Sequence, residues 1–239
     1  LNSVMNGQLL KQGPFKEVFI QPAANDAGNA LGAALWLWHQ LLNQKERFKM
    51  VHAYYGPAYS VAEMEAALKA ANLSYQKVAD PAKFAAEKLA AGKIVGWFQG
   101  RAEVGPRALG HRSILANPCL AEMKDTVNLR IKKREPFRPF APAIIEEYAA
   151  DYLEIPYPTP FMLHVFGIKK EKQNEIPAVC HVDGSARWQT VSQQTSLIFW
   201  QLIEEFRKLT GTPVVLNTSF NVKGEPIVLT PTDAINCFL

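Results

Sequence analysis

Apolar residues occur along this chain in two patterns, which predict a mixture of strands and helices. Short apolar runs bounded by polar or turn residues predict strands at residues 18–20, 93–98, 138–145, 161–166 and 213–221. Apolar residues at helical spacing predict an amphipathic helix over residues 194–211, ended by Gly211, whose inward-facing residues are Leu197, Ile198, Leu202, Ile203 and Phe206. A chain that mixes the two kinds of element without repeats indicates the α/β class.

Capping residues mark where several helices begin. Ser60 with Glu63 forms a capping box at the start of one helix. Asp80 as a cap and Pro81 at the first helical position start another, which ends at Gly92. Two more helices are predicted, over residues 27–42 and from the Thr230 cap onward. Because the chain starts inside an apparent motif and stops within this last helix, we expect it to be a fragment of a longer protein.

The composition predicts a globular, cytoplasmic protein. Of its 239 residues, 48% are hydrophobic and 20% are charged. No apolar run reaches the roughly 18 residues of a membrane span, so we expect no membrane partner. Cys119, Cys180 and Cys237 are odd in number and lack a CxxC spacing. This favours a reducing compartment over a disulfide framework or a zinc site.

Positive charge is concentrated in one segment. Residues 101–138 contain nine Lys or Arg and four Asp or Glu, a local charge of +5, whereas the whole chain carries +4. We therefore expect an anionic ligand at this segment, either a small phosphate compound or a nucleic-acid backbone.

The segment "GWFQGRAEVGPRALGHRSIL", residues 96–115, places three arginines close to glycines. Glycine lets backbone approach a ligand, and guanidinium groups match phosphate oxygens. A tight turn with ordinary surface arginines is the structural alternative. The glycine spacing matches neither a Walker loop nor a Rossmann fingerprint. The arginines are Arg101, Arg107 and Arg112.

Further basic and polar residues follow. If "IKKREPFRP" is extended, Lys132 and Arg134 share one strand face and can bind an anion, the alternative being a solvated basic edge. Ser219 and Asn221 share a face where a buried strand ends, and either donate to a ligand or form a polar turn.

Two acid–base residues have structural alternatives as well. His181, in the turn-like stretch "CHVDGSARWQT" with Arg187, can act as an acid or base, bind a phosphate, or be structural. Asp26 is most simply a helix N-cap.

Taken together, four of these stretches resemble the C-terminal half of nodulation-type O-carbamoyltransferases. They are residues 96–115, "REPFRPFAPAI", "AVCHVDGSARWQT" and "TGTPVVLNTSFNVKGEPI". The resemblance implies a YrdC-like twisted mixed sheet with flanking helices over residues 81–239. It implies that residues 1–55 are the terminal strand–helix segment of an actin/hexokinase-like domain, with a connector and helix at residues 56–80. The family's KxR and SxN signatures appear as Lys132–Arg134 and Ser219–Asn221.

The resemblance implies a two-step reaction. Carbamoyl phosphate and ATP, with Mg²⁺, would give carbamoyl-adenylate, and the carbamoyl group would then pass to an acceptor hydroxyl compound. The implied catalytic residues are Lys132, Arg134, Arg107 and His181, and the implied substrate-binding residues are Arg138, Arg187, Ser219, Asn221, Arg101 and Arg112, the last two with less support. Asp26 matches the family aspartate that completes an iron site with two upstream histidines, which this sequence lacks.

Two alternatives stay open at this point. A threonylcarbamoyl-adenylate synthase for tRNA modification shares the two signatures, although "IQPAANDAGNALGAAL" and "FRPFAP" argue against it. A nucleic-acid-binding module is disfavoured, because the arginines come with glycines rather than in a basic stripe. The sequence leaves the acceptor undetermined, and the oligomeric state as well, a homodimer being one option.

Overall fold

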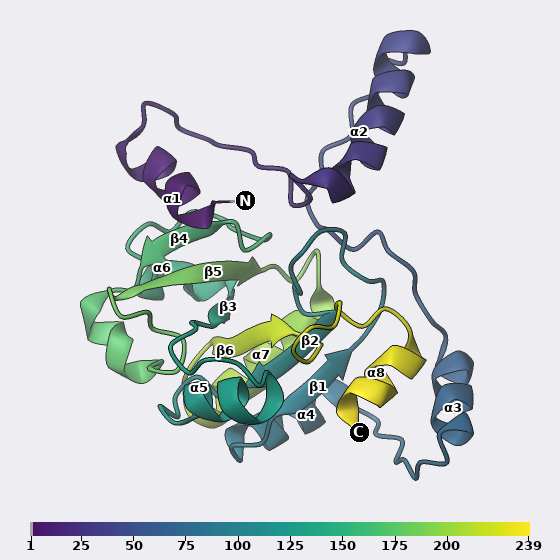
Figure 1. Cartoon of the computed structure of the whole chain (residues 1–239). Helices are drawn as coiled ribbons and strands as arrows, with labels where there is room; N and C mark the ends of the chain where they lie inside the picture. The colour runs from purple at the N-terminus through teal and green to yellow at the C-terminus, as the bar shows by residue number, and fades with distance from the viewer. Residues whose placement is uncertain (1) are drawn as a thin grey trace.

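The computed structural model describes residues 2–239 and contains a sheet of six strands. Their order is β1–β2–β6–β3–β5–β4, with β3 and β5 parallel and each other neighbouring pair antiparallel. This mixed sheet with flanking helices confirms the predicted α/β class (Figure 1). The strands are β1 (Val95–Phe98), β2 (Arg112–Ala116), β3 (Ala141–Ile145), β4 (His164–Gly167), β5 (Ser185–Val191) and β6 (Val214–Ser219).

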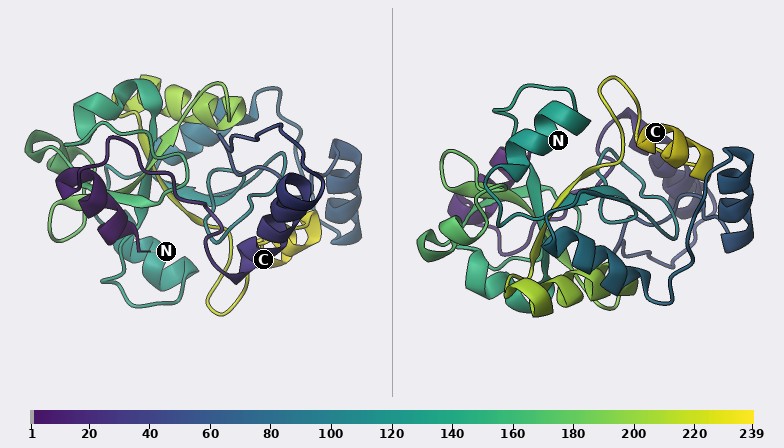
Figure 2. Two further views of the ribbon diagram at one scale, coloured as in Figure 1. Left: turned by 90° about the horizontal axis from the view of Figure 1, so that it is seen from above. Right: turned by 90° about the horizontal axis from the view of Figure 1, so that it is seen from below.

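Helices cover both faces of the sheet. α4 and α7 lie side by side on one face, and α5 with η3 lies on the other (Figure 2). α1 packs on the edge strand β4, whereas α2 and η2 project away from the sheet (Figure 1). The longer helices are α1 (Ser3–Gln12), α2 (Asn29–Trp36), α3 (Val61–Ala70), α4 (Pro81–Ala90), α7 (Leu197–Thr210) and α8 (Pro231–Phe238). The shorter ones are η1 (Asp26–Gly28), η2 (Leu37–Leu41), α5 (Met123–Thr126), η3 (Val127–Ile131), η4 (Glu146–Tyr148), α6 (Ala149–Tyr152) and η5 (Lys170–Glu175).

The central strands are buried on both faces, which explains their nearly continuous apolar sequence. In β6, Val214 and Leu216 belong to the core beneath α5 and α6, whereas Val215 faces α4 and α7. Successive side chains of a strand point to opposite faces, so a strand covered on both sides needs apolar residues at every position.

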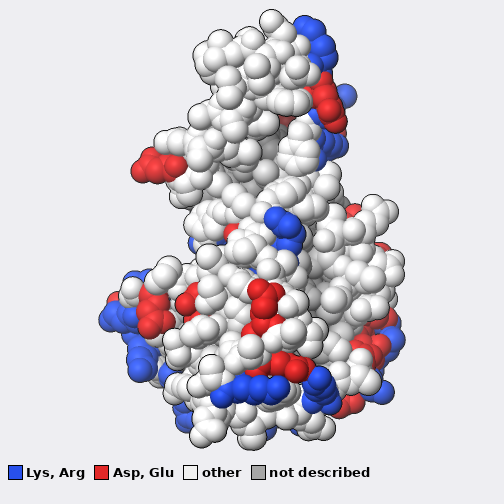
Figure 3. All heavy atoms as spheres, turned by 90° about the vertical axis from the view of Figure 1, so that its right-hand side faces the viewer, with Lys and Arg blue, Asp and Glu red and all other residues white. Residues whose placement is uncertain are grey.

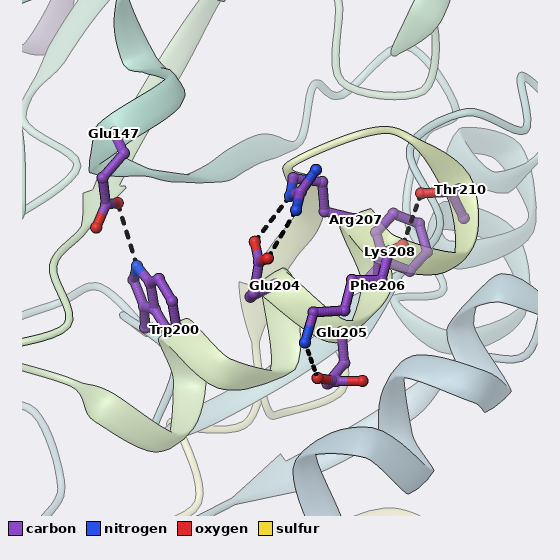
Figure 4. Close-up of polar contacts among 8 residues, drawn as sticks. All are labelled: Glu147, Trp200, Glu204, Glu205, Phe206, Arg207, Lys208 and Thr210. Atoms are coloured by element: carbon purple, nitrogen blue, oxygen red, sulfur yellow. Dashed lines mark hydrogen bonds and ion pairs between the residues drawn. The ribbon is translucent and has the colours of Figure 1, made fainter.

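The amphipathic helix predicted over residues 194–211 is α7, and Gly211 ends it with a φ of 79°. Its inward face differs from the prediction at the first turn. Phe199, Leu202, Ile203 and Phe206 are buried, whereas Leu197 and Ile198 are 48% and 46% exposed. The outer face carries the ion pairs Glu204–Arg207 and Glu205–Lys208, and Trp200 donates to Glu147 (Figure 4).

One predicted strand is absent from the structure, and two observed strands were not predicted. Residues 18–20, predicted as the strand of the terminal strand–helix segment, form no strand, and the Val18 N–H instead donates to the Tyr157 hydroxyl at 3.3 Å. The segment pairs with none of the six strands of the described sheet, and a strand without a partner leaves its backbone groups unpaired. The strands β2 and β5 were not predicted, because each contains an arginine although its other residues are largely buried.

The helix predicted over residues 27–42 forms as η1, α2 and η2 in succession. Its two glycines differ in their surroundings: a Cβ at Gly28 would lie 2.1 Å from the Ala23 carbonyl oxygen, whereas a Cβ at Gly32 would meet nothing within 4 Å. Large apolar side chains such as Trp36 and Leu41 are 58% and 59% exposed, and the projecting segment at the top of Figure 3 presents a broad uncharged surface. Among residues 2–239, no helix combines the length and the apolarity that crossing a membrane demands.

His164 in β4 predicts an acid-sensitive fold. Its side chain is 5% exposed, its Nε2 atom has no hydrogen-bond partner among the described residues, and burial lowers its pKa to about 4. Between pH 4 and 6.5 the unfolded state therefore binds more protons than the folded state, and stability falls as pH falls. His164→Phe keeps the stacking on Phe166 but removes the titrating group. When the pH falls from 6.5 to 4, we expect the unfolding free energy of the variant to fall by about 2–3 kcal/mol less than that of the wild type. Urea unfolding at pH 6.5 and pH 4 measures this, and equal losses in the two proteins would contradict it.

Candidate functional site

A pocket of about 740 Å³ lies between α1, β4 and the segments that lead into β3 and β5. Four arginines line it, and they come from three separate parts of the chain. Arg107 belongs to the loop between β1 and β2, Arg134 and Arg138 to the segment before β3, and Arg187 to β5. His181, in the turn before β5, lines it as well. We call this site the arginine pocket.

The arginines in this pocket have few partners. Arg107 Nε and Arg187 Nε are buried without a hydrogen-bond partner among the described residues. Burial, together with the charges of Arg107 and Arg134, lowers the pKa of Arg187 to about 10. Arg138 alone of the four forms an ion pair, with Glu135 at 2.8 Å. Buried donors and unbalanced positive charge make the pocket complementary to an anion.

Local sequence explains how β5 delivers Arg187 to the pocket. Ala186 and Trp188 are both fully buried in the core, so the residues between and before them, Arg187 and Ser185, point to the opposite face. Arg134 is held differently. Its Nε donates to Asn128 Oδ1 at 2.7 Å, and its guanidinium lies 4.8 Å from the centre of the Phe140 ring.

A second group of predicted residues forms the lysine cluster, consisting of Lys132, Ser219 and Asn221. The Lys132 ammonium donates to Asn221 Oδ1 at 2.7 Å, to the Asn221 carbonyl at 3.0 Å and to Ser219 Oγ at 3.2 Å, and also contacts the Ser219 carbonyl. Ser219 Oγ in turn donates to Asn221 Oδ1 at 2.8 Å. The structure thus unites the predicted KxR and SxN residues, although none of the three lines the arginine pocket.

The route to this cluster differs from the one predicted. Residues 132–134 are not extended, because Lys132 ends the η3 helix and Lys133 turns the chain with a φ of 46°. Lys132 is 4% exposed, and burial with the neighbouring positive charge of Arg134 lowers its pKa to about 8. Since Arg134 lines the arginine pocket, the two sites adjoin.

The glycine-rich loop serves mainly to shape the protein itself. Gly105 and Gly110 have φ of 109° and 99°, and Cβ atoms there would lie 2.9 Å from the Pro22 carbonyl oxygen and 2.2 Å from the Phe199 ring. These glycines therefore bring the loop backbone close to other protein groups. Glu103 ties the loop together by accepting from the N–H groups of Leu109, His111 and Arg112.

Arg101 and Arg112 lie outside the arginine pocket. The buried Arg112 guanidinium donates to backbone carbonyls, including that of Gln99 at 2.7 Å, and stacks 3.6 Å from the Phe98 ring centre. Arg101 donates to the Tyr55 carbonyl at 3.0 Å. Neither side chain forms an ion pair with Glu103, whose Oε1 accepts from three backbone N–H groups.

Asp26 is exposed and does not line the arginine pocket. Asn25, not Asp26, caps η1, since its Oδ1 accepts from the Ala27 N–H at 3.2 Å. Within residues 2–239, no group of three His, Cys, Asp or Glu side chains is arranged to hold a metal ion. The assignment of Asp26 as an iron ligand therefore stays a prediction.

Sequence reasoning missed part of the arginine pocket. Ser3, Gln8 and Lys11 of α1 line one wall, and Ser185 lines another. The α1 residues carry no local signal, because they reach the pocket only through the packing of Gly7 against β4, where Asn6 donates to the Leu163 carbonyl at 2.9 Å.

The fold is thus a mixed α/β sheet with an arginine-lined pocket beside its edge strand β4. Residues 86–239 match the family model described as the carbamoyltransferase C-terminus, and residues 1–35 match that of the carbamoyltransferase N-terminus. The chain belongs to the carbamoyltransferase family.

Curated relatives agree with this assignment. Nodulation protein NolO of Bradyrhizobium diazoefficiens is 46% identical over the whole chain, which spans 44% of that protein. Nodulation protein NolNO of Sinorhizobium fredii is also 46% identical, and the chain spans 36% of it. The chain thus spans less than half the length of these relatives. A solved structure of HypF, described as the phosphate- and nucleotide-bound form, aligns with 70% of this chain and 20% of its own at 21% identity and a TM-score of 0.46.

Proposed function

We propose that the arginine pocket binds carbamoyl phosphate and ATP, and that this part of the carbamoyltransferase forms carbamoyl-adenylate. The observation that carries the proposal is the gathering of Arg107, Arg134, Arg138 and Arg187 around one pocket, with two of their Nε–H groups buried and unpartnered. Both substrates are polyanions, and their phosphate oxygens accept the bidentate bonds that guanidinium groups donate.

The chemistry balances with one water molecule. Carbamoyl phosphate, ATP and water give carbamoyl-adenylate, phosphate and pyrophosphate. Negative charge shifts toward the departing phosphate and pyrophosphate, so arginines fixed in a pocket before substrate arrives stabilise that charge without reorganising. Arg107 and Arg187 hold carbamoyl phosphate, and Arg134 and Arg138 hold phosphates of the nucleotide with Mg²⁺.

The lysine cluster takes a neighbouring role in this proposal. Lys132 already contacts four oxygen atoms of Ser219 and Asn221, one more than an ammonium has protons to donate. A phosphate oxygen can therefore replace one of these acceptors, and Ser219 and Asn221 are then free to bind the triphosphate. In the longer protein, the carbamoyl group would pass to an acceptor hydroxyl, and Asp26 would complete an iron site.

The experiment is a pyrophosphate-release assay of this chain with ATP and Mg²⁺. We expect pyrophosphate release that depends on carbamoyl phosphate and is not supported by threonine with bicarbonate. Release that requires threonine and bicarbonate instead would favour a threonylcarbamoyl-adenylate synthase. Absence of pyrophosphate release under both conditions would overturn the proposal.

A further inference from the structure

The turn that leads into β5 carries three polar side chains on the wall of the arginine pocket: His181, Asp183 and Ser185. Its backbone is closed by two hydrogen bonds, from His181 N–H to the Ser185 carbonyl at 2.8 Å and from Gly184 N–H to the His181 carbonyl at 3.0 Å. Gly184 has a φ of 77°, which favours glycine at this position. The turn therefore holds the three side chains in fixed relative positions beside Arg187.

A chain of hydrogen bonds connects these side chains. Ser185 Oγ donates to Asp183 Oδ1 at 2.6 Å, and the Ser185 N–H donates to the same oxygen at 3.0 Å. These two bonds lower the pKa of Asp183, so it accepts as a carboxylate. Ser185 Oγ also lies 3.4 Å from His181 Nδ1. Because the hydroxyl has one proton and Asp183 receives it, the oxygen can only accept from the imidazole, and Nδ1 must carry a proton.

The protonation of the ring follows from this arrangement. Burial lowers the pKa of His181, with further lowering by Arg187 and Lys124, while the Phe140 carbonyl and Asp183 act in the opposite direction. A neutral imidazole has one N–H, so a ring protonated at Nδ1 keeps a lone pair on Nε2. Nε2 is then the nitrogen that can accept a proton.

Resting on the proposed function, we propose that Ser185 and Asp183 are positioning residues that hold His181 as the Nδ1–H tautomer, so that Nε2 accepts a proton from the water that attacks carbamoyl phosphate. In that step a water O–H bond breaks and its proton goes to Nε2. A new C–O bond forms at the carbamoyl carbon, and the bond to the phosphate oxygen breaks with its electron pair leaving on phosphate. The arginines receive the phosphate, and the imidazolium returns its proton to solvent.

Replacing Ser185 tests this role kinetically. We expect Ser185→Ala to lower kcat for carbamoyl-phosphate-dependent pyrophosphate release by about 10- to 100-fold, a part of what a general base contributes, with KM for carbamoyl phosphate changed less than about threefold. Ser185→Thr keeps the hydroxyl and should restore most of the rate. Ser192→Ala is the matched control, because Ser192 lies outside the pocket and accepts from Gln194 N–H. An unchanged kcat in Ser185→Ala, or a raised KM alone, would overturn the inference.

A second measurement needs no activity. ¹⁵N spectra of the His181 ring in the wild type should show a protonated Nδ1 and an unprotonated Nε2, and the variant Ser185→Ala should show a mixture of both tautomers. A wild-type ring protonated at Nε2 alone would overturn the inference even where pyrophosphate release is present. Conversely, the expected tautomer without pyrophosphate release would leave the hydrogen-bond chain standing and contradict the proposed function.

Discussion

Replacing Arg187 with methionine should lower carbamoyl-phosphate-dependent pyrophosphate release by about 100-fold or more, the loss typical of removing one preorganised donor from an active site. Arg187 is the arginine whose Nε–H is buried without a partner and whose pKa is lowered to about 10. The positive charges of Arg107 and Arg134 repel that of Arg187. Removing the Arg187 charge should therefore leave the unfolding free energy unchanged or higher.

Arg207→Met is the matched control for this variant. Arg207 pairs with Glu204 at 2.7 Å on the outer face of α7, outside the arginine pocket (Figure 4). A surface change of this kind should alter the rate by less than about twofold. If Arg187→Met and Arg207→Met retain the same rate, Arg187 does not bind the substrate.

Of the substitutions proposed for this protein, Gly110→Ala should produce the largest loss of unfolding free energy. A Cβ at this position would lie 2.2 Å from the ring of Phe199, a fully buried residue of α7, and the φ of 99° is unfavourable for any side chain. Left-handed strain of about 1–2 kcal/mol and overpacking of about 1–3 kcal/mol add to an expected loss of about 2–5 kcal/mol in unfolding free energy.

Gly211→Ala separates the two contributions. Gly211 has a similar positive φ of 79°, but a Cβ there would meet nothing within 4 Å. Its replacement should therefore cost only the backbone strain, about 1–2 kcal/mol. Urea denaturation of both variants measures the difference, and equal losses would show that the contact with Phe199 does not constrain Gly110.

The sequence predicts the elements whose burial is simple. β6 and α7 were predicted because apolar residues follow the period of each element, and α3, α4 and α8 because their capping residues stand at the start. β5 was missed although Ala186 and Trp188 alternate with Ser185 and Arg187, because the polar residues of that strand face a pocket rather than solvent. The alternation of apolar and polar residues does not show whether the polar face of a strand meets a pocket or solvent.

Several residues that line the pocket were predicted as site residues, but their layout was not. Positive charge in residues 101–138 indicated an anion site, and Arg107, Arg134 and Arg138 do line one pocket. Lys132 lies against Ser219 at a turn of the chain where Lys133 has a positive φ. Arg112 donates to backbone carbonyls of loops that fold around it. The Lys132–Ser219 and Arg112–Leu229 contacts join residues that lie 87 and 117 positions apart. Residue spacing within a short motif does not predict contacts over such separations.

The central claim is that Arg107 and Arg187 bind the phosphate group of carbamoyl phosphate. Arginine Nε–H resonances recorded during a titration of this chain with carbamoyl phosphate test it most directly, because these two Nε–H groups are buried and unpartnered in the free pocket. We predict that the Arg107 and Arg187 signals shift with saturation while those of Arg112 and Arg207 do not. Unmoved Arg107 and Arg187 signals at saturating carbamoyl phosphate would contradict the assignment of the pocket.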